Sequence, residues 1–213
     1  MLRGSAPSLS ARRLNRPITT RLSAWLRQAW LDKEDFASFR PIRNAYDPRR
    51  ARAAPQGGTS LGVAASFTTI GIGEDTGGSI RGPAAVNSLV GLRPTLPLVS
   101  RQAMSPARPS TDTLGPMTRT VRDAAFVFDV IVGYDQQDPI TAYAIGQMPA
   151  SYTSSLARDG LKGARIGVIR EPMNANTDPR SEDYKKVQAV FDGAVGDLRA
   201  FEAEILDSVT IPG

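Results

Sequence analysis

Residues 71–85 contain the pattern that most constrains this chain, because two glycines stand directly before a serine in Asp75-Thr-Gly-Gly-Ser-Ile-Arg81. Glycine adopts backbone angles that a Cβ forbids, so the chain can turn sharply here with several N–H groups on one side. Such a concavity favours negative charge, including that of the oxyanion formed when a carbonyl is attacked. Ser79 is therefore a candidate nucleophile, and the candidate oxyanion donors are the amides of Thr76, Gly77, Gly78 and Ser79 itself. Taken alone, the same residues also fit a Gly-rich surface turn with a bystander serine.

A serine hydroxyl is a poor nucleophile until a neighbouring base takes its proton. The chain has no histidine and no cysteine, which excludes Ser-His-Asp and Cys-His mechanisms and zinc sites built from those residues. The remaining base is a lysine that burial keeps neutral. Lys162, Lys185 and Lys186 are predicted to be solvated and Lys33 lies in an acidic run, so none of the four lysines is assigned this role.

Residues 44–138 resemble the amidase signature family of serine amide hydrolases. The matching segments are Asn44-Ala-Tyr-Asp-Pro48, Gly57-Gly-Thr59, the run from Gly73 to Pro83, Val90-Gly-Leu-Arg-Pro-Thr95 and Asp112-Thr-Leu-Gly-Pro-Met-Thr-Arg-Thr-Val121. So long an ordered set favours the nucleophile over the bystander at Ser79. The resemblance implies that Ser79 forms the acyl-enzyme, that Asp75 and Arg81 brace its loop, and that neither metal nor cofactor is needed. Met104 resembles a position near the family's substrate pocket and fits a core methionine equally well.

In that family a second serine, held by a cis peptide bond, relays the proton to a buried lysine. An ungapped alignment from Asn44 to Ser79 places Pro55 at the relay-serine position, and proline has no hydroxyl. A gapped alignment offers Thr59 or Ser60 but breaks the register at Asn44. The family lysine is expected farther upstream than this chain extends. A local frameshift over residues 52–56 is one hypothesis for the missing serine, and resequencing the coding DNA tests it.

The resemblance implies an α/β fold with part of a mixed, largely parallel twisted sheet flanked by helices, here incomplete. Residues 1–43 are predicted to be a basic, partly disordered leader with a short helix, and residues 44–213 a partial amidase domain.

The net charge of +5 belongs to the leader, since residues 1–31 hold six arginines and no acid. The leader also fits an organelle transit peptide, although the absence of cysteine fits the cytoplasm. It lacks a nucleic-acid-reading module, so nucleic-acid binding is not favoured.

Periodicity predicts helices within residues 59–69, 120–132 and 181–203 and strands at 69–72, 164–169 and 204–211. The helix over 120–132 is expected to bury Val121, Ala124, Ala125, Phe128, Ile131 and Val132 and to expose Arg122 and Asp129. Residues 82–118 are rich in proline and are expected to form extended segments and turns. The strand, helix, strand order near the C-terminus predicts a parallel pair. No apolar run reaches the length of a membrane span.

The sequence therefore predicts an amide-bond hydrolase that acts on a small-molecule amide through Ser79, with weak or no activity because the relay serine and the lysine are not found. One alternative is a catalytically dead homologue that acts through protein contacts. Another is a component similar to the A subunit of the tRNA-dependent glutamine amidotransferase.

The glycine spacing matches neither G-x-G-x-x-G nor a P-loop, which disfavours nucleotide binding. Uncovered sheet edges and helix faces in a partial domain predict self-association.

Overall fold

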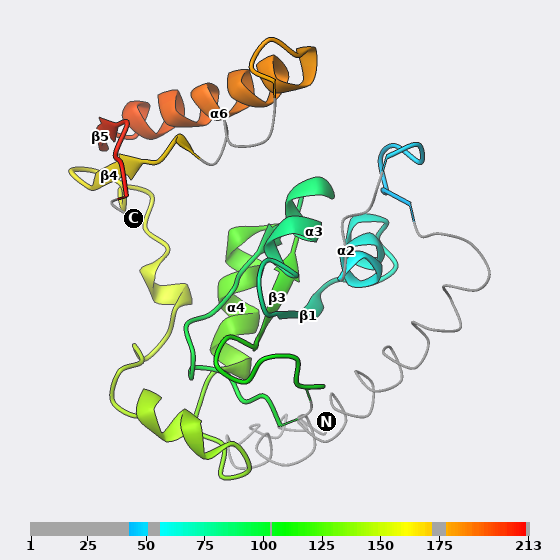
Figure 1. Cartoon of the computed structure of the whole chain (residues 1–213). Coiled ribbons are helices and arrows are strands. Elements are labelled where there is room, and N and C mark those ends of the chain that lie inside the picture. Colours follow the sequence, from blue (N-terminus) through cyan, green and yellow to red (C-terminus); the bar gives the residue numbers. More distant parts are fainter. Residues whose placement is uncertain (1–42, 51–55, 103, 172–177, 212–213) are drawn as a thin grey trace, which may run out of the picture. The chain divides into compact units, whose positions relative to one another are not determined.

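A computed structural model describes residues 43–50, 56–102, 104–171 and 178–211 (Figure 1). Contacts divide the chain into two compact units, here called unit 1 and unit 2. The boundary along the chain falls between Thr153 and Ser154. The predicted leader helix and its boundary at residue 43, Lys33 and Pro55 lie outside the described residues or at their edge, so those expectations stay predictions.

The sheet of unit 1 consists of β1 (Gly71–Asp75), β2 (Val90–Gly91) and β3 (Thr113–Thr118). Their order is β1-β3-β2, and both pairings are antiparallel. Gly71 lies opposite Met117 and Asp75 opposite Thr113. All of β3 is buried, as expected of a central strand. The short strand β1 was predicted, and it delivers the chain into the Gly-rich loop that follows Asp75.

The described helices of unit 1 are α2 (Gly57–Ala64), α3 (Arg81–Val86), α4 (Val121–Ile131) and the 3₁₀ turn η2 (Pro139–Ala144). A further described 3₁₀ turn, η3 (Thr153–Ser155), crosses into unit 2. The predicted helix start at residue 120 is confirmed, because the Thr120 hydroxyl accepts a hydrogen bond from the Asp123 amide. The α3 helix was missed within the proline-rich segment. Pro83 is compatible with it because the N–H groups of a helix's first turn have no intrahelical partner.

The apolar core of unit 1 is formed by Ile72, Val99, Leu114, Val127 and Phe128. The Phe128 ring packs against Tyr152, with ring centroids 4.4 Å apart. On α4 the buried residues are Ala124, Val127 and Phe128, whereas Val121, expected inside, is 60% exposed. Val121 begins the helix, one turn before the first residue that reaches the core.

Polar side chains are also buried in unit 1, among them Ser60, Asn87, Thr118 and Thr141. The Asn87 amide donates to the Ser60 hydroxyl at 3.0 Å and to the Pro83 carbonyl at 3.1 Å. Its side-chain oxygen accepts the Ala45 amide at 3.2 Å. One asparagine thus joins the 43–50 segment to α2 and α3.

The sequence pattern predicts that Asp129 is exposed. The structure corrects this, because the Asp129 carboxylate is bound by residues of a later turn. Its carboxylate accepts hydrogen bonds from the Ser151 hydroxyl, the Tyr152 amide and both the amide and the hydroxyl of Thr153. These donors lie more than twenty residues along the chain, beyond the reach of helical periodicity. The Thr153 hydroxyl is the main cause that lowers the pKa of Asp129 to about 2, with further lowering from Ser151 and the two amides against the opposing effect of burial.

The turn at residues 151–153 should therefore respond to acid at an unusually low pH. Because the folded-state pKa lies below the value of 3.8 for a free aspartate, the stabilisation is complete above about pH 4 and is lost as the pH falls through about 2. We expect the amide NMR signals of Tyr152 and Thr153 to titrate with a midpoint near pH 2, and Asp129→Asn to abolish that inflection. A midpoint near pH 4 would contradict the arrangement.

Unit 2 contains β4 (Arg165–Val168), α6 (Glu182–Ala200) and β5 (Glu204–Asp207). The two strands are parallel, with Arg165 opposite Glu204, and the Ser181 hydroxyl caps α6 by accepting the Tyr184 amide. The predicted strand, helix, strand unit is confirmed. Together with unit 1 it gives the expected mixed α/β fold, with a larger antiparallel share among the described strands than the sequence led us to expect.

Much of the apolar surface of α6 and its C-terminal end is exposed. Val187 and Phe201 are 62% and 58% exposed, and Val195 is the buried residue of the helix. The cause is that the described part of unit 2 is one helix on a two-stranded sheet. The self-association predicted for such faces stays a prediction. Among the described helices, none combines the length and the apolar character needed to cross a membrane.

Candidate active site

Asp75, the last residue of β1, organises the loop that carries Ser79. Its side chain is fully buried. One carboxylate oxygen accepts the Gly78 amide at 2.7 Å and the other accepts the Ile80 amide at 3.1 Å. The residues on either side of Ser79 are thus bound to a single carboxylate. Gly78 has a φ of +133°, a conformation that favours glycine and lets the loop fold back over Asp75.

Two arginines neutralise Asp75. The Arg81 Nε lies 3.3 Å from one carboxylate oxygen and the Arg93 Nε lies 3.2 Å from the other. Burial raises the pKa of Asp75, but hydrogen bonds from Arg81, Gly78 and Ile80 outweigh it and hold the pKa below its usual range. The structure therefore brings Asp75 and Arg81 together beside the loop, and their role in bracing it stays a prediction. Arg93 was missed as a partner, although it lies in the matching segment Val90-Gly-Leu-Arg.

The neighbours of Ser79 are fixed by packing as well. Ile80 is fully buried, and Gly73 and Gly91 make room for it. A Cβ at Gly73 would lie 3.1 Å from Ile80, and a Cβ at Gly91 would also lie 3.1 Å from it. Ser79 itself is half-buried. It is held between the hydrogen-bonded Gly78 and the packed Ile80.

The predicted set of oxyanion donors needs one correction. The Gly78 amide already donates to Asp75, so it is not available to a substrate oxygen in this structure. Among the described residues, no partner takes a hydrogen bond from the amides of Thr76, Gly77 or Ser79. These three amides remain the candidate donors, and Gly77 is exposed at the loop surface.

The Thr76 side chain binds a buried acid, Asp112, that the sequence analysis did not single out. Its hydroxyl donates to one Asp112 carboxylate oxygen at 2.6 Å. The other Asp112 oxygen accepts the amides of Ala107 and Arg108 at 2.8 and 2.6 Å. Asp112 is the first residue of the matching segment that includes β3. Its place in that segment is the sequence signal that could have identified it as a site residue.

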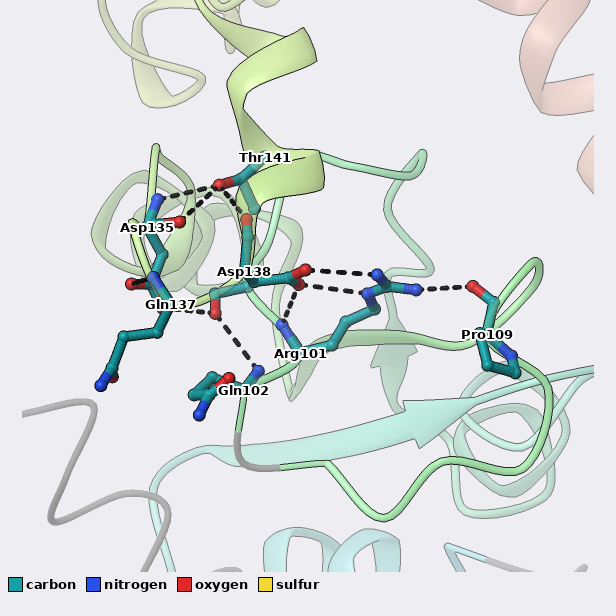
Figure 2. A network of polar contacts seen from close by, with 8 residues as sticks. Arg101, Gln102, Pro109, Asp135, Gln137, Asp138 and Thr141 are labelled. Atoms are coloured by element: carbon teal, nitrogen blue, oxygen red, sulfur yellow. Dashed lines mark hydrogen bonds and ion pairs between the residues drawn. The ribbon is translucent and has the colours of Figure 1, made fainter.

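A cavity of about 200 Å³ lies beside this acid, lined by Arg101, Gln102, Met104, Pro106, Pro109, Asp112 and Asp138. Figure 2 shows the polar contacts along one side of it, where the Arg101 guanidinium pairs with Asp138 and also donates to the Pro109 carbonyl. Met104 lines the cavity and also packs against the apolar core. The expectation of a core methionine is confirmed, and a place near the substrate pocket stays a prediction.

Among the described residues of unit 1, which contain no lysine, no side chain is hydrogen-bonded to the Ser79 hydroxyl, so neither a relay serine nor a general base is assigned to it. Of the two gapped alternatives for the relay, Thr59 donates to the Gln56 side-chain oxygen at 3.4 Å. Ser60 donates to the Gly57 carbonyl and accepts from Asn87. Lys162 and Lys185 lie in unit 2, where they pair with Glu202 and Glu182. In the part of the chain that the structure describes, no cluster of His, Cys, Asp or Glu is arranged to hold a metal ion.

Known proteins resemble this chain in sequence and in fold. Residues 33–212 match the family model described as Amidase. The chain therefore belongs to the amidase family, whose solved members share its fold.

Curated relatives include the A subunit of the glutamyl-tRNA(Gln) amidotransferase of Gloeobacter violaceus, which is 38% identical over 79% of this chain and 32% of its own length. The corresponding protein from Deinococcus deserti is 39% identical over 64% of this chain and 27% of its own length.

Among solved structures, the native peptide amidase of Stenotrophomonas maltophilia has a TM-score of 0.70 at 37% identity, covering 80% of this chain and 33% of its own. The A subunit of the glutamyl-tRNA(Gln) amidotransferase of Thermotoga maritima has a TM-score of 0.71 at 32% identity, covering 82% and 36%. The chain thus spans about a third of the length of these relatives.

Proposed function

We propose that this chain carries the nucleophile loop of a serine amide hydrolase, with Ser79 as the attacking residue. The observation that supports this most directly is the Asp75 carboxylate, which binds the amides of Gly78 and Ile80 and so fixes the backbone on both sides of the hydroxyl. A bystander serine in a surface turn would not need a fully buried, doubly charge-paired aspartate beneath it.

The proposed reaction has two halves. Ser79 Oγ forms a bond to the carbonyl carbon of a small-molecule amide, and the amides of Thr76, Gly77 and Ser79 hold the resulting oxyanion. The C–N bond then breaks, and the proton given up by the Ser79 hydroxyl passes through solvent to the leaving nitrogen, which departs as ammonia or an amine. Water then attacks the acyl-enzyme, which releases the acid and returns a proton to Ser79 Oγ. No step of this scheme requires a metal or a cofactor.

The rate of this chemistry is proposed to be low. Since the members of a serine triad act as a unit, losing the main ones lowers turnover on the order of 10⁶-fold. Oxyanion binding alone leaves roughly 10³- to 10⁴-fold acceleration over water. With no relay serine or lysine assigned to Ser79, the chain should lie near that residual level. The second candidate function is therefore a catalytically dead homologue that acts through protein contacts.

A third candidate is supported by the names of the relatives. A component like the amidotransferase A subunit would form the same acyl-enzyme but pass the released ammonia to a partner protein. The sequence relatives with that name are 36–41% identical to this chain over their matched regions. The geometry around Ser79 serves either use, and the two differ in whether ammonia release depends on added partner proteins.

A serine-reactive fluorophosphonate probe tests the proposal. We expect the probe to label the purified chain at Ser79, located by peptide mapping, because a positioned hydroxyl next to oxyanion donors reacts with such probes. Ser79→Ala should remove the label, and Ser105→Ala, a matched change at an exposed serine of the same unit, should leave it. A folded chain that stays unlabelled would support the dead homologue instead.

A further inference from the structure

Two acids, not one, hold the loop that carries Ser79. Asp75 binds the loop from inside through the amides of Gly78 and Ile80. Asp112 binds it from outside through the Thr76 hydroxyl at 2.6 Å, across 36 residues of sequence. Asp112 is only 2% exposed, so this hydrogen bond to a charged acceptor is shielded from water and is stronger than a neutral one.

The segment of residues 107–112 is itself held at several points. The Asp112 carboxylate accepts the amides of Ala107 and Arg108, and Arg93 joins Asp75 to the Thr111 carbonyl, to which it donates at 2.6 Å. Arg101 donates to the Pro109 carbonyl at 2.5 Å. The second acid therefore belongs to a fixed segment and can serve as a firm support for the loop.

That support continues away from Ser79. The Arg101 guanidinium binds both carboxylate oxygens of Asp138, at 3.2 and 3.3 Å, and the Arg101 amide binds Asp138 at 2.8 Å (Figure 2). Asp138 in turn precedes η2, where the Thr141 hydroxyl donates to its backbone carbonyl. Hydrogen bonds and the backbone of residues 107–112 thus connect Thr76 to η2, and Asp112, Pro109, Arg101 and Asp138 on this route line the 200 Å³ cavity.

We propose that Asp112 is a positioning residue for Ser79, which acts by fixing the Thr76 hydroxyl and thereby the direction of the Thr76 and Gly77 amides. If Asp112 served only to close its own turn, the amides of Ala107 and Arg108 would be sufficient partners. The additional hydroxyl bond reaches the loop whose amides, at Thr76, Gly77 and Ser79, are the proposed oxyanion donors. The inference rests on the proposed function for its kinetic consequence but not for its structural one.

Thr76→Val separates these two roles of Asp112. Valine has nearly the shape of threonine but no hydroxyl, so the bond to the loop is lost while both amide bonds to Asp112 remain. Thr76→Ser restores the hydroxyl and serves as the conservative rescue. Thr111→Val is the matched control, because it removes a hydroxyl in the same segment that makes only a long contact of 3.4 Å to the Arg108 carbonyl.

Two measurements on the full chain report the result. Hydrogen exchange of the hydrogen-bonded loop amides, those of Gly78 and Ile80, should become roughly 10- to 100-fold faster in Thr76→Val, the range for loss of one hydrogen bond to a charged group. Exchange in α4 should not change. Fluorophosphonate labelling of Ser79 should slow by roughly tenfold or more if that bond orients the donors. Thr76→Ser and Thr111→Val should stay within about twofold of the parent, as substitutions away from special features do.

The outcomes separate this inference from the proposed function. Unchanged exchange at the Gly78 and Ile80 amides in Thr76→Val would overturn the positioning role, however strongly Ser79 is labelled. Faster exchange throughout the unit, α4 included, would also overturn it, because the bond would then serve general stability. If the parent chain is never labelled while Thr76→Val loosens only the loop, the positioning role stands and the hydrolase proposal fails. Asp112→Asn provides a second test, and it should loosen the same loop while keeping a neutral acceptor.

Discussion

Asp75→Ala should destabilise unit 1 by about 3–5 kcal/mol, the range for removing one partner of a buried ion pair. The substitution leaves the amides of Gly78 and Ile80 without an acceptor and removes the shared anion of Arg81 and Arg93. The free energy should be read from hydrogen exchange of the β3 amides, because the central strand exchanges through unfolding of the whole unit. Labelling of Ser79 should be lost together with the loop.

Asp123→Asn is the matched control for Asp75. Asp123 is an exposed acid in the first turn of α4, and it contributes only about 0.3–1 kcal/mol through the helix dipole. The backbone amide of residue 123 still donates to the Thr120 hydroxyl after the change. If Asp75→Ala lowers the stability of unit 1 no more than Asp123→Asn does, the buried carboxylate does not organise the loop.

Gly115→Ala is expected to have the second large effect on the stability of unit 1. Gly115 lies in the central strand β3 opposite Gly73, and a Cβ there would collide with the Leu92 carbonyl oxygen and lie 2.7 Å from the Pro94 ring. Neither backbone nor proline can move cheaply, so we expect destabilisation of about 3 kcal/mol, the upper end for an overpacked core. The transition of unit 1 in a thermal scan followed by circular dichroism should fall by roughly 10 °C.

Gly82→Ala tests whether the collision, and not the loss of a glycine, causes that effect. A Cβ at Gly82 meets nothing within 4 Å, and the residue lies within α3. Because alanine favours helix over glycine by about 0.5–1 kcal/mol, this variant should be neutral or slightly more stable. A comparable loss of stability in both variants would contradict the packing described for β3.

Local signals in the sequence were sufficient for several elements. Thr120 followed by Asp123 marks a helix start, and the structure has that cap. Ser181 marks the start of α6, and the strands on either side of that helix pair in parallel as expected. These features depend on residues a few positions apart, where spacing and capping chemistry decide the conformation. The contact between Asp75 and Arg81 is equally local.

The features that were missed depend on partners far along the chain. Asp129 was placed toward solvent because its helix position is polar, yet its donors are at residues 151–153. Asp112 meets Thr76 across 36 residues, and Asn87 meets Ser60 across 27. The α3 helix was hidden by Pro83, since proline usually reads as a break. Gly78 was named as an oxyanion donor because its acceptor, Asp75, could not be placed from spacing alone.

The polar side chains buried in unit 1 also bear on how its stability varies with temperature. Exposing apolar groups to water gives unfolding its large positive heat capacity, whereas exposing polar groups reduces that quantity. Interior positions that aliphatic residues fill in most cores are occupied here by Ser60, Asp75, Asn87, Asp112, Thr113 and Thr141. The stability curve of this unit should therefore be flatter than that of an aliphatic domain of equal size, with a weaker tendency to unfold in the cold.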